Sequence, residues 1–152
     1  MGLMATDEID VLATARKNVS EDYSPDASEP YMSAKQLEFF RKLLVEWKQS
    51  ILDASAGTLQ QLQDGPIREP DLNDRASSET DWGIELRTRD RQRKLIAKIE
   101  SALRRIDEGE YGYCEVTGEP IGLGRLIARP IATMTVEAQE AHERREKISR
   151  DD

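Results

Sequence analysis

The sequence predicts a mainly α protein, a long antiparallel coiled-coil hairpin that carries a small globular domain and ends in a C-terminal helix. The composition is 38% hydrophobic, 34% charged and only 5% aromatic. Such a balance suits long solvated helices with a narrow apolar seam better than a thick globular core. In addition, apolar residues recur at alternating spacings of three and four in two long segments, and a break rich in Pro and Gly separates them.

The N-terminal segment, residues 1–32, is acidic. Residues 1–30 hold seven acids against two bases, so they supply most of the net charge of −8. Residues 9–19 permit one short amphipathic helix. Residues 20–30, rich in Ser, Asp, Glu and Pro, are typical of a linker. We therefore expect the ordered body to begin near Tyr31.

The hairpin is expected to cover residues 33–108. Ser33 is suited to cap its first helix, and the break at residues 64–76 forms its tip. At 1.5 Å per residue, the arms reach on the order of 45 Å. The seam residues expected in the first arm are Leu37, Phe40, Leu44, Trp47, Ile51 and Ala54, and those in the second arm are Trp82, Leu86, Ile96, Ile99, Leu103 and Ile106. Between Leu86 and Ile96 the seam falls on Arg89 and Arg93, where either the aliphatic stems of the arginines cover the partner helix or the pairing loosens.

The chain changes character after the second long helix. Gly109 and Gly112 end that helix, and frequent Gly and Pro residues divide residues 109–134 into short β-prone pieces. These pieces predict a small knuckle with a hairpin. Residues 135–152 return to helical composition, and Thr135 is suited to cap the last helix.

Composition also excludes several classes of protein. A single cysteine allows no intrachain disulfide and favours a reducing, cytoplasmic location. No stretch approaches the roughly 18 apolar residues of a membrane span, and the first residues lack the features of a signal peptide. Because no domain-wide basic field exists to release phosphate counterions, direct binding to DNA is not expected. A protein partner with basic surfaces is the simpler inference.

Three stretches together resemble one family. They are YMSAKQLEFFRKLLVEW at the start of the hairpin, DLNDRA at its tip, and RTRDRQRKLIAKIESALRRIDEGEYGYC leading into the small domain. They resemble the DksA/TraR family, and the resemblance covers residues 30–150. It implies a non-enzymatic transcription regulator that enters the secondary channel of RNA polymerase, contacts the β′ subunit, and modulates rRNA and stringent-response promoters. It also implies the alarmone ppGpp as a co-regulator.

The resemblance assigns roles to the tip and to a basic run beside it. Asp71, Asp74 and Ala76 match the family pattern D-x-x-D-x-A, in which the two carboxylates act near the polymerase catalytic centre. Without the family, aspartates at a helix start usually satisfy free N–H groups and the helix dipole. Residues 87–94 hold five bases and one acid, and in the family this region meets polymerase. By themselves such runs are usually solvated helix faces.

Two sets of positions follow from the same resemblance. Polymerase contact is expected at Arg87, Arg91 and Lys94. The positions that match the alarmone-contacting residues are Leu95, Lys98, Arg129 and Gln139. Gln139 stands where the family pattern has a lysine, and the loss of one cation weakens a phosphate site.

The zinc site of the family is degenerate here. The family places two C-x-x-C pairs in a zinc finger, whereas this chain has Cys114, Thr117, Thr135 and Ala138. We expect no structural zinc and no other stably bound cofactor. The zinc-finger-like knuckle must then be held by apolar packing and by hydrogen bonds of the two threonine hydroxyls. The apolar residues expected to pack there are Ile121, Leu123, Leu126, Ile127 and Ile131.

Two other functions remain open at this point. A Gre-like transcript-cleavage factor would use tip acids to recruit a second metal ion, although Gre-type tips carry adjacent acids and Asp71 and Asp74 are separated. A generic coiled-coil adaptor would tolerate the exchange of either aspartate. In each case an intrachain seam needs no partner helix, so a monomer is expected.

Overall fold

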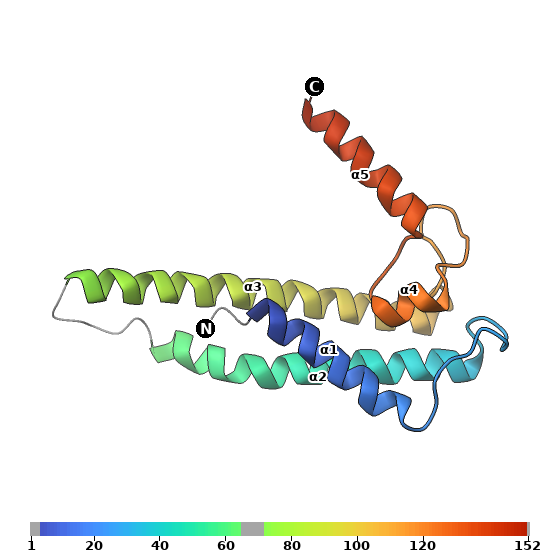
Figure 1. The fold of residues 1–152 in the computed structure, drawn as a ribbon, viewed down its shortest axis with the longest axis horizontal. Coiled ribbons are helices and arrows are strands. Elements are labelled where there is room, and N and C mark those ends of the chain that lie inside the picture. Colours follow the sequence, from blue (N-terminus) through green and yellow to red (C-terminus); the bar gives the residue numbers. More distant parts are fainter. Residues whose placement is uncertain (1–3, 65–71, 152) are drawn as a thin grey trace.

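The computed structural model describes the backbone of residues 4–64 and 72–151, and the side chains of residues 11–54 and 80–149. The described part contains the helices α1 (Met4–Ser20), α2 (Ala34–Asp64), α3 (Leu72–Glu108), α4 (Leu123–Ala128) and α5 (Val136–Asp151). The long helices α2 and α3 lie side by side, α1 crosses α2, and α5 projects away from the hairpin (Figure 1). The predicted fold class is confirmed.

Two ion pairs show the antiparallel register of the hairpin. Arg41 of α2 pairs with Asp107 of α3, and Lys48 pairs with Glu100, with 3.4 Å between Nζ and Oε1. Seven residues separate the two partners on each helix, in opposite directions along the chain. Exposed pairs of this kind contribute little stability each. The apolar seam between the helices therefore carries most of the energy, through the buried residues Phe40, Leu43, Leu44, Trp47, Ile51, Ile99, Ala102 and Ile106.

The middle of the seam differs from the prediction. Arg89 and Arg93 are exposed and Leu86 is 44% exposed, whereas Thr88 (1%) and Gln92 (7%) are buried. A straight α-helix drifts by about 20° per heptad against a strict 3.5-residue repeat. Burying an unpaired guanidinium also costs far more than burying a hydroxyl or an amide. The expectation of arginines in the seam was wrong for these two reasons.

The N-terminal segment is part of the folded body, contrary to expectation. The helix α1 extends beyond the predicted residues 9–19, and its Ala15 is 1% exposed within the core. After the helix, the hydroxyl of Tyr23 donates a hydrogen bond of 2.6 Å to Glu29, and the Tyr23 ring meets Phe39 edge to face. Ordered packing thus begins well before Tyr31.

The start of α2 agrees with the predicted cap. The hydroxyl oxygen of Ser33 accepts a hydrogen bond from the N–H of Gln36, and the side-chain oxygen of Gln36 accepts one from the N–H of Met32. This reciprocal pattern resembles a capping box and satisfies two N–H groups that lack helical partners. Because Gln36 is fully buried, the cap also ties the segment before α2 to the core.

The small domain contains more helix than predicted. Among the described residues, its β structure is a single antiparallel bridge between Tyr113 and Pro120. Residues 123–128 form the helix α4 instead of a strand. Its residue Leu126 is fully buried. Gly112 allows the turn before the bridge: its φ is +94°, and an added Cβ would lie 2.6 Å from the sulfur of Met32. Only glycine fits both requirements.

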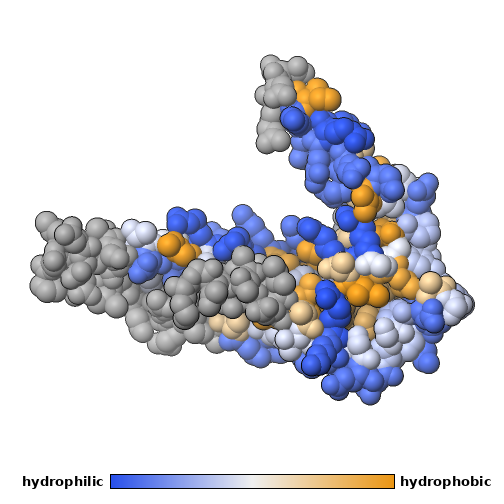
Figure 2. All heavy atoms as spheres, in the orientation of Figure 1, coloured by the Kyte–Doolittle hydropathy of each residue, from blue (hydrophilic) through white to orange (hydrophobic). Residues whose placement is uncertain are grey.

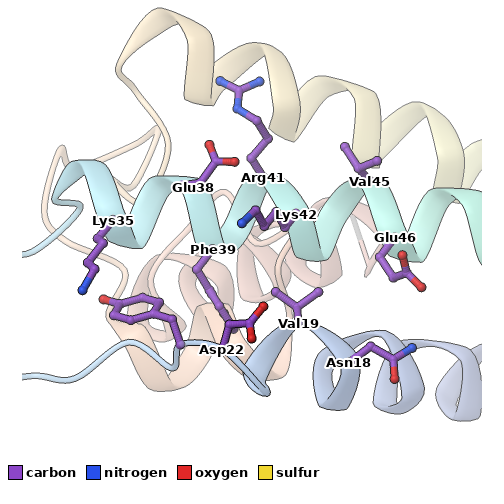
Figure 3. A pocket seen from close by; sticks show the side chains of 11 residues that line it. Asn18, Val19, Asp22, Lys35, Glu38, Phe39, Arg41, Lys42, Val45 and Glu46 are labelled. Atoms are coloured by element: carbon purple, nitrogen blue, oxygen red, sulfur yellow. The ribbon is translucent and has the colours of Figure 1, made fainter.

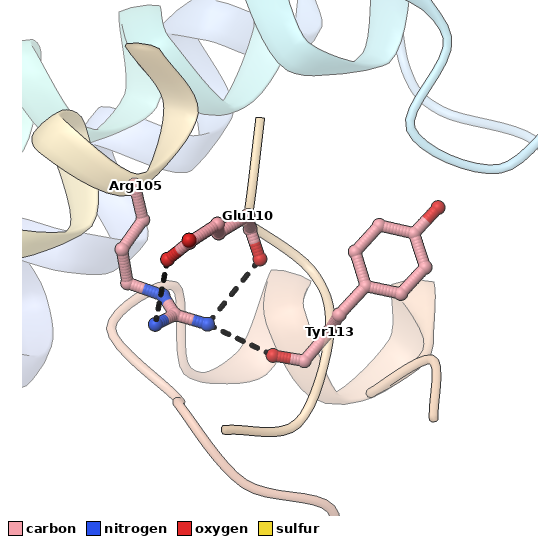
Figure 4. A network of polar contacts seen from close by, with 3 residues as sticks. All are labelled: Arg105, Glu110 and Tyr113. Atoms are coloured by element: carbon pink, nitrogen blue, oxygen red, sulfur yellow. Dashed lines mark hydrogen bonds and ion pairs between the residues drawn. The ribbon is translucent and has the colours of Figure 1, made fainter. Parts of the chain in front are cut away.

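Polar contacts fasten the small domain to the end of α3. The guanidinium of Arg105 donates hydrogen bonds to the carbonyls of Glu110 and Tyr113, at 3.2 and 2.9 Å (Figure 4). Within the domain, the buried hydroxyl of Tyr111 donates to the carbonyl of Pro130 at 2.8 Å. In Figure 2, apolar surface gathers where the small domain meets the hairpin, while α5 is mostly hydrophilic. The joint is therefore packed and hydrogen-bonded, whereas α5 is solvated.

Candidate functional site

The predicted tip residues are only partly described. Asp71 lies outside the described residues. Asp74 and Ala76 lie in the first turns of α3, where the backbone is helical, but their side chains lie outside the described set. The role predicted for the tip therefore stays a prediction.

A basic face follows on α3. Arg87, Arg91 and Lys94 are separated by four and three residues, which places them on one side of the helix, and all three are exposed. Together with Ile84, Thr88 and Asp90 they line a hollow of about 540 Å³. We call Arg87, Arg91 and Lys94 the basic face.

The charge of the basic face is not neutralised within the described residues. The nearby carboxylate of Asp90 pairs with Arg93 at 2.8 Å, and no ion pair reaches Arg87, Arg91 or Lys94 from the part of the chain that the structure describes. Arginine presents a rigid fork that suits carboxylates and phosphates, and lysine adds a point charge. The charge of this side of the hairpin is thus complementary to an acidic surface.

A second group of cations lies where α3, α4 and α5 meet. Lys98 of α3, Arg125 of α4, the C-cap residue Arg129 and Gln139 of α5 line one pocket of about 280 Å³. We call it the anion pocket. Three of the four positions predicted for the alarmone are therefore brought together. The fourth, Leu95, is half-buried against the core one turn before Lys98.

Arg125 was not singled out from the sequence. Its Nε donates a hydrogen bond of 2.9 Å to the carbonyl of Met134, which holds the guanidinium at the edge of the anion pocket. Its spacing of four residues from Arg129 was the available signal. Because the segment was expected to be β-prone, that spacing carried no meaning there.

The four degenerate zinc positions surround a turn without forming a metal site. The hydroxyl oxygen of Thr117 accepts a hydrogen bond from the N–H of Glu119, and that of Thr135 accepts one from the N–H of Ala138, both at 3.2 Å. Cys114 is buried and Ala138 offers no donor atom. One thiol, two engaged hydroxyls and a methyl group do not fit the four thiolates of a structural zinc site. Across residues 4–64 and 72–151, no group of three or more His, Cys, Asp or Glu residues is placed to hold a metal ion.

Neighbouring polar groups oppose the effect of burial on the thiol of Cys114. Burial raises the pKa of the thiol, but the hydroxyl of Thr117 and the N–H groups of Thr135, Thr117 and Val116 act in the opposite direction and lower its pKa to about 6. Hydrogen bonds to the charged form of a group favour that form. The pocket that would hold a zinc-bound thiolate in the family thus stabilises a free one here.

Another hollow, of about 640 Å³, lies between α1 and α2 (Figure 3). Its charged residues carry both signs, and two of its cations already have partners. Arg41 pairs with Asp107, and Lys35 lies 5.0 Å from the centroid of the Tyr23 ring. The hollow lacks a convergent set of groups, so the basic face and the anion pocket remain the candidate site.

A solvated hairpin with an exposed basic face and an anion pocket at its base is typical of proteins that act by binding other macromolecules. Comparison with known proteins agrees. Residues 36–106 match the family model for the N-terminal domain of DnaK suppressor protein DksA, and residues 109–144 match that for the prokaryotic dksA/traR C4-type zinc finger.

Individual relatives resemble the chain over most of its length. The RNA polymerase-binding transcription factor DksA of Caulobacter vibrioides is 62% identical over 131 residues, covering 86% of this chain and 92% of that protein. The protein of the same name from Escherichia coli strain K12 is 39% identical, covering 93% and 92%. The solved structure of transcription factor DksA2 from Pseudomonas aeruginosa has a TM-score of 0.71 at 41% identity, covering 87% of this chain and 98% of that one. The chain belongs to the DksA/TraR family.

A further observation concerns the hydropathy of the helices. None of the helices within the described residues is long and apolar enough to cross a bilayer.

Proposed function

We propose that the protein is a transcription regulator that binds RNA polymerase and catalyses no reaction itself. The hairpin enters the secondary channel and contacts the β′ subunit, while the small domain remains at the channel entrance. Relatives at 62% and 39% identity are RNA polymerase-binding transcription factors by name. The observation on this chain that carries the proposal is the exposed basic face of α3, which no ion pair reaches from the described residues.

In this proposal the division of the chain follows function. The hairpin at residues 33–108 reaches into the channel, and the knuckle at 109–134 and the helix from 135 to 152 stay outside it. Asp71, Asp74 and Ala76 at the tip act near the polymerase active site and alter the stability of open complexes. Promoters with short-lived open complexes, such as those of rRNA genes, respond most. The protein acts as a monomer.

The anion pocket is proposed as the chain's half of a ppGpp site. Lys98, Arg125 and Arg129 offer three cations at one rim, and a polyphosphate is the kind of ligand that such a cluster recognises. Gln139 lies in the same pocket and can donate a hydrogen bond but no charge. We therefore propose that ppGpp binds between this pocket and polymerase, more weakly than it would with a lysine at position 139.

The small domain is proposed to keep its fold without zinc. The donor set at Cys114, Thr117, Thr135 and Ala138 does not suit the metal, and the hydrogen bonds of Tyr111 and Arg105 hold the neighbouring segments in place. No step of the proposed function passes through a metal held by this chain.

The basic face can be tested with two arginines of the same run. Arg91→Gln removes a cation from the basic face, whereas Arg93→Gln removes one that does not line the hollow and pairs with Asp90. We expect Arg91→Gln to weaken binding to polymerase by about ten- to hundredfold, because a charge-assisted contact contributes roughly 1.5–3 kcal/mol. Arg93→Gln should stay within about twofold of wild type. Equal effects of the two substitutions would show that the basic face is not the contact surface.

The tip is tested by transcription from a stable-RNA promoter, with and without ppGpp, using polymerase from the same source. Asp74→Asn should bind polymerase as wild type does but lose the inhibition of initiation. Inhibition that survives in Asp74→Asn would refute the assignment of the tip. Cleavage of the transcript in a backtracked complex would instead favour the Gre-like alternative.

A further inference from the structure

Helix α4 is held at both ends by the N-terminal segment. At its end, the Nε of Arg16 donates a hydrogen bond of 3.1 Å to the carbonyl of Ile127, across 111 positions of sequence. At its start, the hydroxyl of Tyr31 accepts a hydrogen bond of 2.9 Å from the N–H of Gly122 and donates one of 2.7 Å to the carbonyl of Gly112. Two residues that precede α2 thus fix a helix of the small domain.

The contact of Arg16 satisfies a specific need of α4. The last four carbonyls of an α-helix lack helical partners, and Ile127 is the second-last residue of this six-residue helix. A cation is also favourable at the negative end of a helix. Since so short a helix has little stability of its own, its orientation depends on the groups that hold it from outside.

The part of α1 that carries Arg16 is packed against the core. Its neighbour Ala15 is 1% exposed, and Val11 and Val19 pack against the same core, each four residues from Ala15. These residues place one face of α1 on α2. Arg16, half-buried beside that face, therefore connects the hairpin to α4 without depending on the end of α3.

Both arginines of the anion pocket depend on the position of α4. Arg125 belongs to the helix and Arg129 is its C-cap, with its N–H bonded to the carbonyl of Arg125 at 2.7 Å. Lys98, by contrast, belongs to α3. The separation between Lys98 and the two arginines is thus set by how α4 sits against the hairpin.

We propose that Arg16 is a positioning residue for the anion pocket: by holding the carbonyl of Ile127, it keeps Arg125 and Arg129 at the separation from Lys98 that a polyphosphate requires. The inference rests on the ppGpp pocket of the proposed function and adds a residue that does not line the pocket. A misplacement of binding groups by about 1 Å is enough to lower function strongly.

The test compares Arg16→Met with Lys17→Met in the full-length chain. Both remove one cation from α1, but Lys17 is exposed and has no contact with α4 among the described residues. Two quantities are measured: amide hydrogen exchange of residues 123–129 in the free chain, and the ppGpp affinity that the chain adds to RNA polymerase. The same measurement on Lys98→Ala shows how much of the added ppGpp affinity depends on the anion pocket.

We expect Arg16→Met to speed exchange in α4 and to lower the added ppGpp affinity about three- to tenfold, with unchanged polymerase binding in the absence of ppGpp. Lys17→Met should match wild type in each measurement. Unchanged exchange in Arg16→Met, or faster exchange without loss of ppGpp affinity, overturns the inference. An equal loss of ppGpp-free polymerase binding overturns it too, because it would indicate a general structural role. If Lys98→Ala binds ppGpp as wild type does, the proposed pocket itself is wrong, and that outcome is distinct from a failure confined to Arg16.

Discussion

The hydroxyl of Tyr111 offers a direct test of how the small domain is held together. Tyr111 is 2% exposed, and its hydroxyl donates a hydrogen bond of 2.8 Å to the carbonyl of the fully buried Pro130. The bond joins the turn after α3 to the turn after α4, across 19 positions of sequence. If the domain is closed by such bonds and not by zinc, loss of this hydroxyl must cost measurable stability.

The expected cost of Tyr111→Phe follows from the burial of both partners. A typical hydrogen bond contributes about 1 kcal/mol net, but a buried acceptor that loses its donor also incurs its desolvation penalty, about 1–3 kcal/mol. Because the ring stays in place, no cavity forms. We expect a loss of about 1–2 kcal/mol, which for a chain of this size corresponds to a melting temperature lower by roughly 2–8 °C.

Tyr113→Phe provides the matched control. The Tyr113 ring packs edge to face on Tyr31 with centroids 5.7 Å apart, a contact that phenylalanine keeps, and its hydroxyl donates no hydrogen bond to any described residue. Urea and thermal unfolding of both variants, with hydrogen exchange of residues 109–134, give the comparison. If Tyr111→Phe is no less stable than Tyr113→Phe, this bond does not close the domain and the reasoning fails.

Three further predictions concern the same elements. Prolonged treatment with a chelator should leave the melting temperature unchanged, and a loss that added zinc restores would contradict the zinc-free proposal. Because the folded-state pKa of Cys114 is lowered from 9.0 to about 6, its thiolate contributes stability that is full above pH 9 and is lost as the pH falls to 6. The stability difference between wild type and Cys114→Ala should therefore shrink between pH 9 and pH 6, and a difference independent of pH would refute the pKa shift. Finally, Thr88→Val should stabilise the chain by about 0.5–1 kcal/mol in urea unfolding, because the buried hydroxyl of Thr88 has no hydrogen-bond partner among the residues that the structure describes. A destabilised Thr88→Val would show that this hydroxyl is satisfied.

The hairpin could be predicted from the sequence because its signals are local and repeated. A seam of apolar residues at spacings of three and four, a cap at Ser33 and a break rich in Pro and Gly each point to the same structure. The prediction of the seam residues failed at Ala54, which is exposed, and where the pattern itself weakens. Between Leu86 and Ile96 apolar residues are absent from the expected positions, so the pattern could not decide between Arg89 and Thr88, and desolvation cost decided instead.

The joint between the N-terminal segment and the small domain could not be predicted. Acidic, Ser- and Pro-rich composition indicated a linker, yet Tyr23 within it packs on Phe39. The bond between Arg16 and Ile127 links residues 111 positions apart, and no periodicity within either segment encodes it. The role of Arg125 stayed hidden for the same reason, since it depends on where α4 is placed.

The donor set at the four zinc positions does not fit the metal, so other bonds must hold the small domain together. The hydrogen bonds of Tyr111, Arg105 and Tyr31 can be understood in this way. In a zinc finger, the metal joins two turns and contributes folding energy outright. Here Tyr111 joins the start and the end of the knuckle, while Arg105 from α3 and Tyr31 from the N-terminal segment bond to its carbonyls and N–H groups. Because the bonds of Arg105 and Tyr31 come from elements outside the knuckle, the shape of the knuckle depends on them. The proposed role of Arg16 in positioning the anion pocket follows the same logic, and a zinc ion held by the knuckle alone would reduce that dependence.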